Sequence, residues 1–243
     1  MTKERIGFSP DHWDRTIAPM MARIDTRVGN LLRAPIWSHD GGLQDNSRER
    51  WFQHGKDEAA ISALYYIHYP NDLPKDVKLE DILFGYAVHD IGKSEVSPDP
   101  TIWHRKRTDL TAPELAALQN HVTTAVTLLK RYEYISGETL PNVMYEIVTR
   151  HHEKLDGTGN PNHLIGDMLS PVVRLAAVID QVVSRCEPRS YHDRSFTLKE
   201  AMEEVAKGSG TAYDPEVITK VRNLFMNDVH LQIPTLTWLG SWK

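Results

Sequence analysis

Histidine and aspartate occur together at the end of a segment that otherwise has the pattern of a buried helix. The chain holds three His-Asp pairs, namely His39-Asp40, His89-Asp90 and His192-Asp193. Only the middle pair follows an apolar helical segment, and Lys93 comes soon after it. Burying histidine, aspartate and lysine together costs free energy unless their charges are compensated. A metal ion compensates them well, because imidazole nitrogen and carboxylate oxygen are ligands for zinc, iron or manganese.

Four other segments place histidine or aspartate on the inward face or at the end of a predicted helix. They hold His54, His121, the adjacent pair His151-His152, and Asp180. His54 is expected just before its helix, whereas His121 and Asp180 interrupt apolar faces. Adjacent helical residues project about 100° apart, so His151 and His152 can bind different metal ions or flank a single site.

Each of these residues also has an ordinary structural interpretation. A single histidine on an apolar face is more often a hydrogen-bonded core residue, and Asp180 could pair with Arg174 or Arg185. This interpretation weakens for the whole set, because five separate segments each offer an inward histidine or aspartate. We therefore predict two metal ions bridged by a carboxylate, with the ligands His54, His89, Asp90, His121, His151, His152 and Asp180.

The elements that must position these residues are predicted to be helices. Thr111–Glu114 and Thr197–Glu200 have the pattern of capping boxes, with Pro113 in the first turn of its helix. No clean period-2 alternation indicates strands. The other predicted helices cover 56–68, 80–91, 142–152, 172–184 and a segment from 214–215 toward 225. The sequence thus predicts an all-α bundle, with the segment 172–184 at its centre because it is apolar nearly all round.

The chain is predicted to have three parts: a helical extension at residues 1–50, the main domain at 51–230, and a tail at 231–243. Apolar residues at helical spacing from Trp13 to Leu32 indicate an amphipathic helix in the extension. Such a stripe favours packing on the core. A dimerisation element and a substrate lid are the alternatives.

Composition excludes several classes of protein. A net charge of −5 argues against binding of nucleic-acid polymers, so an anionic substrate would need a local positive site such as metal ions. No apolar run approaches the roughly 18 residues of a membrane helix, and the N-terminus shows no secretory signal. Cys186 is the single cysteine, which excludes an intramolecular disulfide and fits a reducing cytoplasm.

The order of these motifs resembles the HD-GYP branch of the HD superfamily, over about residues 50–225. The matching residues are His54, His89-Asp90-Ile91-Gly92-Lys93, Pro98-Asp99, His121, His151-His152-Glu153, Asp156-Gly157-Thr158-Gly159-Asn160-Pro161, Asp180, Arg189-Ser190-Tyr191 and Gly210–Pro215. The resemblance implies an HD-domain helical bundle with two or three metal ions, often iron or manganese. It also implies cyclic di-GMP phosphodiesterase activity.

Three departures from the family pattern bear on the site. Asn160 replaces the tyrosine that, in the family, shapes a loop bordering the substrate and partner proteins. Asparagine tolerates a left-handed backbone conformation, so we expect the turn to survive this replacement. Arg50 replaces a glutamate found in members with three ions, which favours two ions here. His192 and Asp193 replace basic residues, which leaves Arg189 to contact phosphate.

The resemblance and the residues together predict hydrolysis of a cyclic dinucleotide, with cyclic di-GMP as the first candidate, by water activated between two divalent metal ions. Asp90 and Asp180 are the expected shared carboxylates, and Asp90 is counted as catalytic. Lys93 is expected to contact a phosphate or to protonate the leaving oxygen. Arg189 is expected to bind phosphate. Iron or manganese are the expected ions, with zinc, nickel or magnesium as alternatives.

Two other functions stay open at this stage. One is an HD enzyme for another substrate, either another phosphorylated small molecule or, as in related diiron oxygenases, an organophosphonate or inositol. The other is a catalytically weak sensor that binds a nucleotide and a partner signalling protein. A homodimer is open as well.

Overall fold

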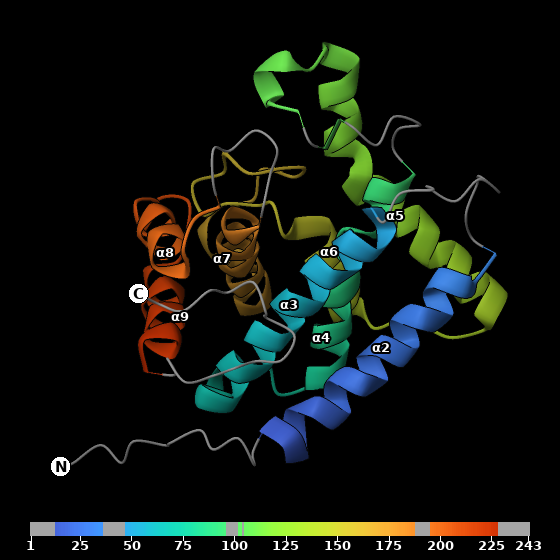
Figure 1. The fold of residues 1–243 in the computed structure, drawn as a ribbon, viewed down its shortest axis with the longest axis horizontal. Coiled ribbons are helices and arrows are strands. Elements are labelled where there is room, and N and C mark those ends of the chain that lie inside the picture. Colours follow the sequence, from blue (N-terminus) through green and yellow to red (C-terminus); the bar gives the residue numbers. More distant parts are fainter. Residues whose placement is uncertain (1–12, 36–46, 96–101, 104, 188–194, 228–243) are drawn as a thin grey trace.

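The computed structural model describes residues 13–35, 47–95, 102–103, 105–187 and 195–227 (Figure 1). Within these ranges the chain forms helices and two isolated bridges but no strand, which confirms the predicted all-α fold. None of the helices described is both long and apolar enough to cross a membrane. The α-helices are α2 (Ala18–Arg33), α3 (Ser47–His68), α4 (Leu79–Val88), α5 (Ala112–Ser136), α6 (Asn142–Arg150), α7 (Pro171–Cys186), α8 (Leu198–Ala206) and α9 (Pro215–Asn227).

Helices α3, α4 and α7 form the middle of the bundle, with α8 and α9 on one side and α2 on the other (Figure 1). Helix α7 buries apolar residues along its whole length, as predicted for the central helix. Helices α3 and α4 approach closely at Gly55, where a Cβ atom would lie 2.6 Å from the carbonyl oxygen of Ala87. This contact sets the residues next to Gly55 beside the C-terminal end of α4.

The predicted capping signals are confirmed. Helix α5 begins with a capping box in which the side chain of Thr111 accepts from the amide of Glu114 and the Glu114 carboxylate accepts from Thr111. Helix α8 begins with the second capping box, and the carboxylate of Asp214 accepts the first amides of α9. These contacts satisfy amide groups that have no partner inside a helix.

Three predicted helix boundaries were wrong. Helix α3 begins at Ser47, so His54 lies inside the helix and not before it. Its first turns carry mostly charged and polar residues and therefore show no apolar stripe. Helices α4 and α6 end at Val88 and Arg150, each earlier than predicted. In both cases a histidine follows the helix, and its side chain bonds one of the last carbonyl groups.

The N-terminal helix α2 packs on the core, as its apolar stripe predicts. Its buried residues are Met21, Ile24, Val28 and Leu31. The guanidinium of Arg27 lies 4.0 Å from the centre of the Phe84 ring of α4 and also pairs with Glu138 at 2.7 Å. The predicted boundary between residues 50 and 51 falls inside α3.

Candidate metal centre

The seven predicted ligands meet in one region, where α3, α5 and α7 pass the ends of α4 and α6. All of them are buried except His152, whose side chain is 25% exposed. Together with Glu58, the seven residues form two groups of four, and the donor atoms of each group lie within 4.8 Å of one another. The Asp90 cluster consists of Asp90, His121, His151 and His152, and the Glu58 cluster consists of His54, Glu58, His89 and Asp180.

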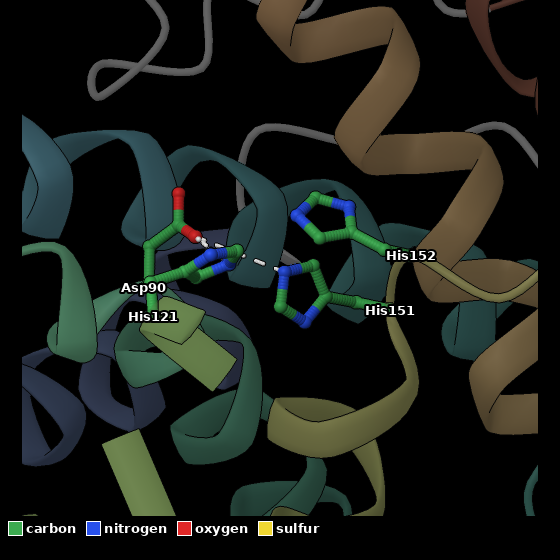
Figure 2. A group of neighbouring side chains, drawn as sticks. All are labelled: Asp90, His121, His151 and His152. Atoms are coloured by element: carbon green, nitrogen blue, oxygen red, sulfur yellow. Dashed lines mark ion pairs between the residues drawn. The ribbon is translucent and has the colours of Figure 1, made fainter. Parts of the chain in front are cut away.

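The Asp90 cluster combines one carboxylate with three imidazoles (Figure 2). One oxygen of Asp90, Oδ1, lies 3.4 Å from Nε2 of His121 and 3.7 Å from Nε2 of His151. The His152 ring lies next to that of His151, with ring centres 4.0 Å apart. The adjacent histidines thus flank a single cluster, which was one of the two arrangements that their spacing allowed.

The Glu58 cluster contains a residue that the sequence analysis missed. Glu58 is only 1% exposed, and its Oε1 lies 2.9 Å from Nε2 of His54. Oδ1 of Asp180 lies 3.4 Å from the same nitrogen. The spacing of four residues between His54 and Glu58 places both on one face of α3, and this was the available signal.

Asp90 and Asp180 each face both clusters. While Oδ1 of Asp90 is turned toward His121 and His151, its Oδ2 lies 3.4 Å from Nε2 of His89. Asp180 likewise presents Oδ1 to His54 and Oδ2 to His152, at 3.4 and 3.8 Å. Such an arrangement suits carboxylates shared between two ions.

Hydrogen bonds hold the imidazole rings with one nitrogen turned inward. The Nδ1 of His89 bonds the carbonyl oxygen of Tyr86 at 2.7 Å, and those of His121 and His151 bond carbonyls of their own helices. A carbonyl only accepts, so each of these Nδ1 atoms carries a proton and Nε2 is the nitrogen left to face the centre. His54 instead directs Nδ1 to the carboxylate of Glu187, at 2.8 Å.

Five of the inward-facing atoms have no hydrogen-bond partner within the described part of the chain. They are Nε2 of His89, His121 and His151, Oδ1 of Asp90, and Oε1 of Glu58. Leaving one buried polar atom without a partner costs about 1–3 kcal/mol. Five such atoms converging on one place fit metal ions, which take both imidazole nitrogen and carboxylate oxygen as ligands at about 2.0–2.2 Å.

The electrostatics of the Asp90 cluster suit metal binding. Burial lowers the pKa of His121 to about 3, and burial together with His152 holds the pKa of His151 well below its ordinary value. Burial by itself would raise the pKa of Asp90, but Lys93 and His89 hold it well below its ordinary value. Neutral imidazoles and an ionised carboxylate are the protonation states that bind a metal ion.

The electrostatics of the Glu58 cluster differ. Burial lowers the pKa of His89, but the carboxylates of Glu58 and Asp90 outweigh it and raise the pKa to about 9. A metal ion entering this cluster must therefore displace a proton from the imidazole.

Lys93 lies at the edge of the Asp90 cluster. Its ammonium group forms an ion pair with Oδ2 of Asp90, and its Nζ lies 5.2 Å from the ring centre of Trp103. The Trp103 ring also contacts the His121 ring at 5.9 Å between centres. Trp103 escaped the sequence analysis, because nothing in its local pattern connects it to the histidines.

Asp180 does not form the ion pairs that were its structural alternative. Arg174 bonds Asp214 and Asp167, and Arg185 bonds the side chain and carbonyl of Gln181. Asp180 is thus left facing the histidines.

The loop after α6 is held to the centre by Glu153, which proves fully buried. Its two carboxylate oxygens accept the amides of Asn162 and Leu164, at 2.6 and 3.0 Å. The turn at Asn160 is present, but Asn160 does not adopt the left-handed backbone conformation on which the prediction relied. The positive φ angles of this loop lie at Gly157, His163 and Gly166 instead.

Several residues of the sequence analysis lie outside the described ranges. They are the predicted phosphate ligand Arg189, the pairs His39-Asp40, Pro98-Asp99 and His192-Asp193, and the tail at 231–243.

Comparison with known proteins points to a common domain. A family model described as an HD domain matches residues 47–217. A 3'3'-cGAMP-specific phosphodiesterase of Vibrio cholerae is 37% identical over 131 residues, covering 54% of this chain and 24% of that protein. A cyclic di-GMP phosphodiesterase of Pseudomonas aeruginosa is 29% identical over 157 residues, covering 65% and 34%. One of Thermotoga maritima is 31% identical over 143 residues, covering 59% and 37%. The matched segment spans well under half of each relative.

Proposed function

The chain belongs to the HD-domain family, and we propose that it is a metal-dependent phosphodiesterase that hydrolyses a cyclic dinucleotide, with cyclic di-GMP as the first candidate. The observation that carries this proposal is the convergence of buried donor atoms without hydrogen-bond partners on one centre. Two cations held there would neutralise charge on the phosphoryl oxygens and activate a water molecule for attack.

We assign the seven predicted ligands to the metal ions. A mixed set of imidazoles and carboxylates accepts iron or manganese, and zinc, nickel or magnesium are the ions to compare with them. The names of the relatives support the choice of substrate, because proteins with a similar segment act on cyclic di-GMP or on 3'3'-cGAMP.

The substrate enters where the centre is open to solvent. Among the proposed ligands, the side chain of His152 is 25% exposed and the others are at most 5% exposed. The side chain of Lys93, which is not a ligand, is 15% exposed. Trp103 lies at the same edge, against Lys93. Its partly exposed ring offers a face on which a nucleobase can stack.

Lys93 acts on the phosphate. Its ammonium group pairs with Asp90 and lies over the Trp103 ring, and it is not among the converging donor atoms. From there it can bind a phosphoryl oxygen or give a proton to the leaving oxygen. Arg189 is proposed to bind a second phosphate oxygen.

The proposal is tested by loading the protein separately with manganese, with zinc and, under anaerobic conditions, with ferrous iron. Cleavage of cyclic di-GMP, 3'3'-cGAMP and a simple phosphodiester is then measured. We expect a cyclic dinucleotide to be opened by at least one metal form. Lys93→Ala should keep its metal and lose about 10²–10⁴-fold in rate.

Lys130→Ala serves as the control, because Lys130 is an exposed lysine of α5 paired with Glu133, and it should leave the rate unchanged. Absence of cleavage with every metal and substrate would overturn the phosphodiesterase proposal. Full activity of Lys93→Ala would remove Lys93 from the mechanism.

A further inference from the structure

The two clusters differ in charge, although Asp90 and Asp180 each face both of them. The Asp90 cluster holds one carboxylate and three imidazoles, whereas the Glu58 cluster holds two carboxylates and two imidazoles. Carboxylate oxygens favour hard ions such as manganese and magnesium, and imidazoles suit zinc and nickel better. The two positions should therefore bind the same ion with unequal strength.

We propose that Glu58 is a metal ligand and that it makes the Glu58 cluster the first and tighter of two binding sites for a hard divalent ion. The inference rests on the proposed two-ion centre but not on the identity of the substrate. It adds a ligand from the middle of α3 and an order of filling.

The position of Glu58 supports its assignment as a metal ligand. Its side chain is 1% exposed, and it is followed along α3 by the fully buried Ala59, Ala60 and Ile61. Water therefore cannot solvate the carboxylate. Oε1 lies 2.9 Å from Nε2 of His54, and both residues belong to the group whose donor atoms all lie within 4.8 Å of one another. A nitrogen and an oxygen at this separation can both bind one ion.

The second oxygen of Glu58 is turned toward the other histidine of the cluster. Oε2 lies 3.7 Å from Nδ1 of His89, while that nitrogen bonds the carbonyl of Tyr86. The carboxylate therefore lies between His54 and His89, and it receives no hydrogen bond from His89 that would compensate its charge. A buried carboxylate between two imidazoles is placed to bind a cation that both rings also bind.

The neighbouring Asp57 provides a matched control. It is also 1% exposed and lies on the same helix, but its Oδ1 accepts a hydrogen bond from Gln53 at 2.9 Å. Asp57→Asn keeps an oxygen acceptor and removes one negative charge next to the centre. Comparison of Asp57→Asn with Glu58→Gln separates the loss of a nearby charge from the loss of a ligand.

The experiment titrates the metal-stripped full chain with manganese and follows free manganese by its paramagnetic resonance signal. The wild type should bind two ions in two steps that differ by at least about tenfold in dissociation constant. Glu58→Gln should weaken the tight step by at least about tenfold, as expected for the loss of a ligand, and leave the weak step unchanged. His121→Ala should weaken the weak step and leave the tight step unchanged. Asp57→Asn should keep both steps as in the wild type.

A second readout separates a ligand from a structural ion pair. If Glu58 is a ligand, added manganese should raise the unfolding temperature of the wild type by more than that of Glu58→Gln, because a ligand stabilises the folded state in proportion to its affinity. A lower unfolding temperature of metal-free Glu58→Gln with both binding steps intact would identify Glu58 as a structural partner of the histidines and overturn the proposal.

Other outcomes are equally decisive. Equal weakening of both steps in folded Glu58→Gln would overturn the assignment of Glu58 to one site. Two steps in Glu58→Gln identical to those of the wild type would overturn this inference alone. A wild type that binds fewer than two ions would instead overturn the two-ion centre of the proposed function.

Discussion

The metal centre and a polar cavity between α3, α7 and α9 draw on opposite ends of the same two helices. The centre uses His54 of α3 and Asp180 of α7, whereas the cavity uses Tyr65 of α3 and Arg174 of α7. The cavity has a volume of about 480 Å³ and is also lined by acidic and basic residues. Charged side chains alone therefore do not distinguish the two regions.

The difference lies in how the charges are compensated. In the cavity, Lys220 pairs with Asp72 and Glu216, each at 2.7 Å, and the hydroxyl of Tyr65 donates to Asp72 at 2.6 Å. Arg174 pairs with Asp214 at 3.0 Å. At the centre, by contrast, five of the converging donor atoms have no hydrogen-bond partner among the described residues. The convergence of such atoms on one place, more than the number of charges, sets the proposed binding site apart from the cavity.

The largest effect is expected from Asp90→Ala. Because the two oxygens of Asp90 face different clusters, its loss should weaken both ions and abolish cleavage. Metal analysis after desalting should find well below two ions per chain. Asp72→Asn is the matched change in the cavity and should keep the wild-type metal content. If Asp90→Ala retains two ions, the carboxylate is not shared and the contrast between the regions fails.

A smaller effect is expected from Asn160→Tyr at the rim of the centre. The amide of Asn160 bonds the carbonyl of His152 at 3.2 Å through the backbone alone, so a new side chain should leave the metal content unchanged. An added aromatic ring offers surface to a nucleobase or a partner protein. We expect KM for the cyclic dinucleotide to change by several-fold, about 1 kcal/mol, with a smaller change in kcat. Loss of metal in this variant would place residue 160 inside the centre.

The smallest effect is expected from Lys220→Met in the cavity. Its ion pairs are about one-fifth to three-quarters exposed, so the free energy of unfolding should fall by only about 1 kcal/mol or less. Urea denaturation of the metal-free protein measures it. Metal content and cleavage should equal those of the wild type. A change in metal binding would show that the cavity and the centre are coupled along α3 or α7.

The fold followed from local signals wherever these were strong. The capping boxes at Thr111 and Thr197 and the apolar pattern of α7 predicted their helices correctly. The start of α3 was missed, because its first turns are held by tertiary contacts such as the burial of Phe52 and carry no apolar stripe. The ends of α4 and α6 were missed because buried residues, Ile91 and His151, continue the inward pattern beyond each helix.

The candidate site was only partly predictable for a related reason. A histidine or an aspartate on an apolar face stands out in the sequence, and all seven such residues meet in the structure. A glutamate on a helix usually extends into water, so Glu58 did not stand out despite its spacing from His54. Trp103 could not be found, because its contact with Lys93 joins segments that no local pattern connects.

The hydrogen bonds from the loop after α6 to Glu153 bear on which residues of that loop can change in evolution. The loop is attached through backbone amides, those of Asn162 and Leu164, to a buried carboxylate next to the histidines. Side chains that project from the loop, such as the exposed Ile165 and Met168, take no part in this attachment. They can be exchanged while the backbone keeps its course. The exposed side chains of this loop can thus change by mutation without loss of its attachment to Glu153.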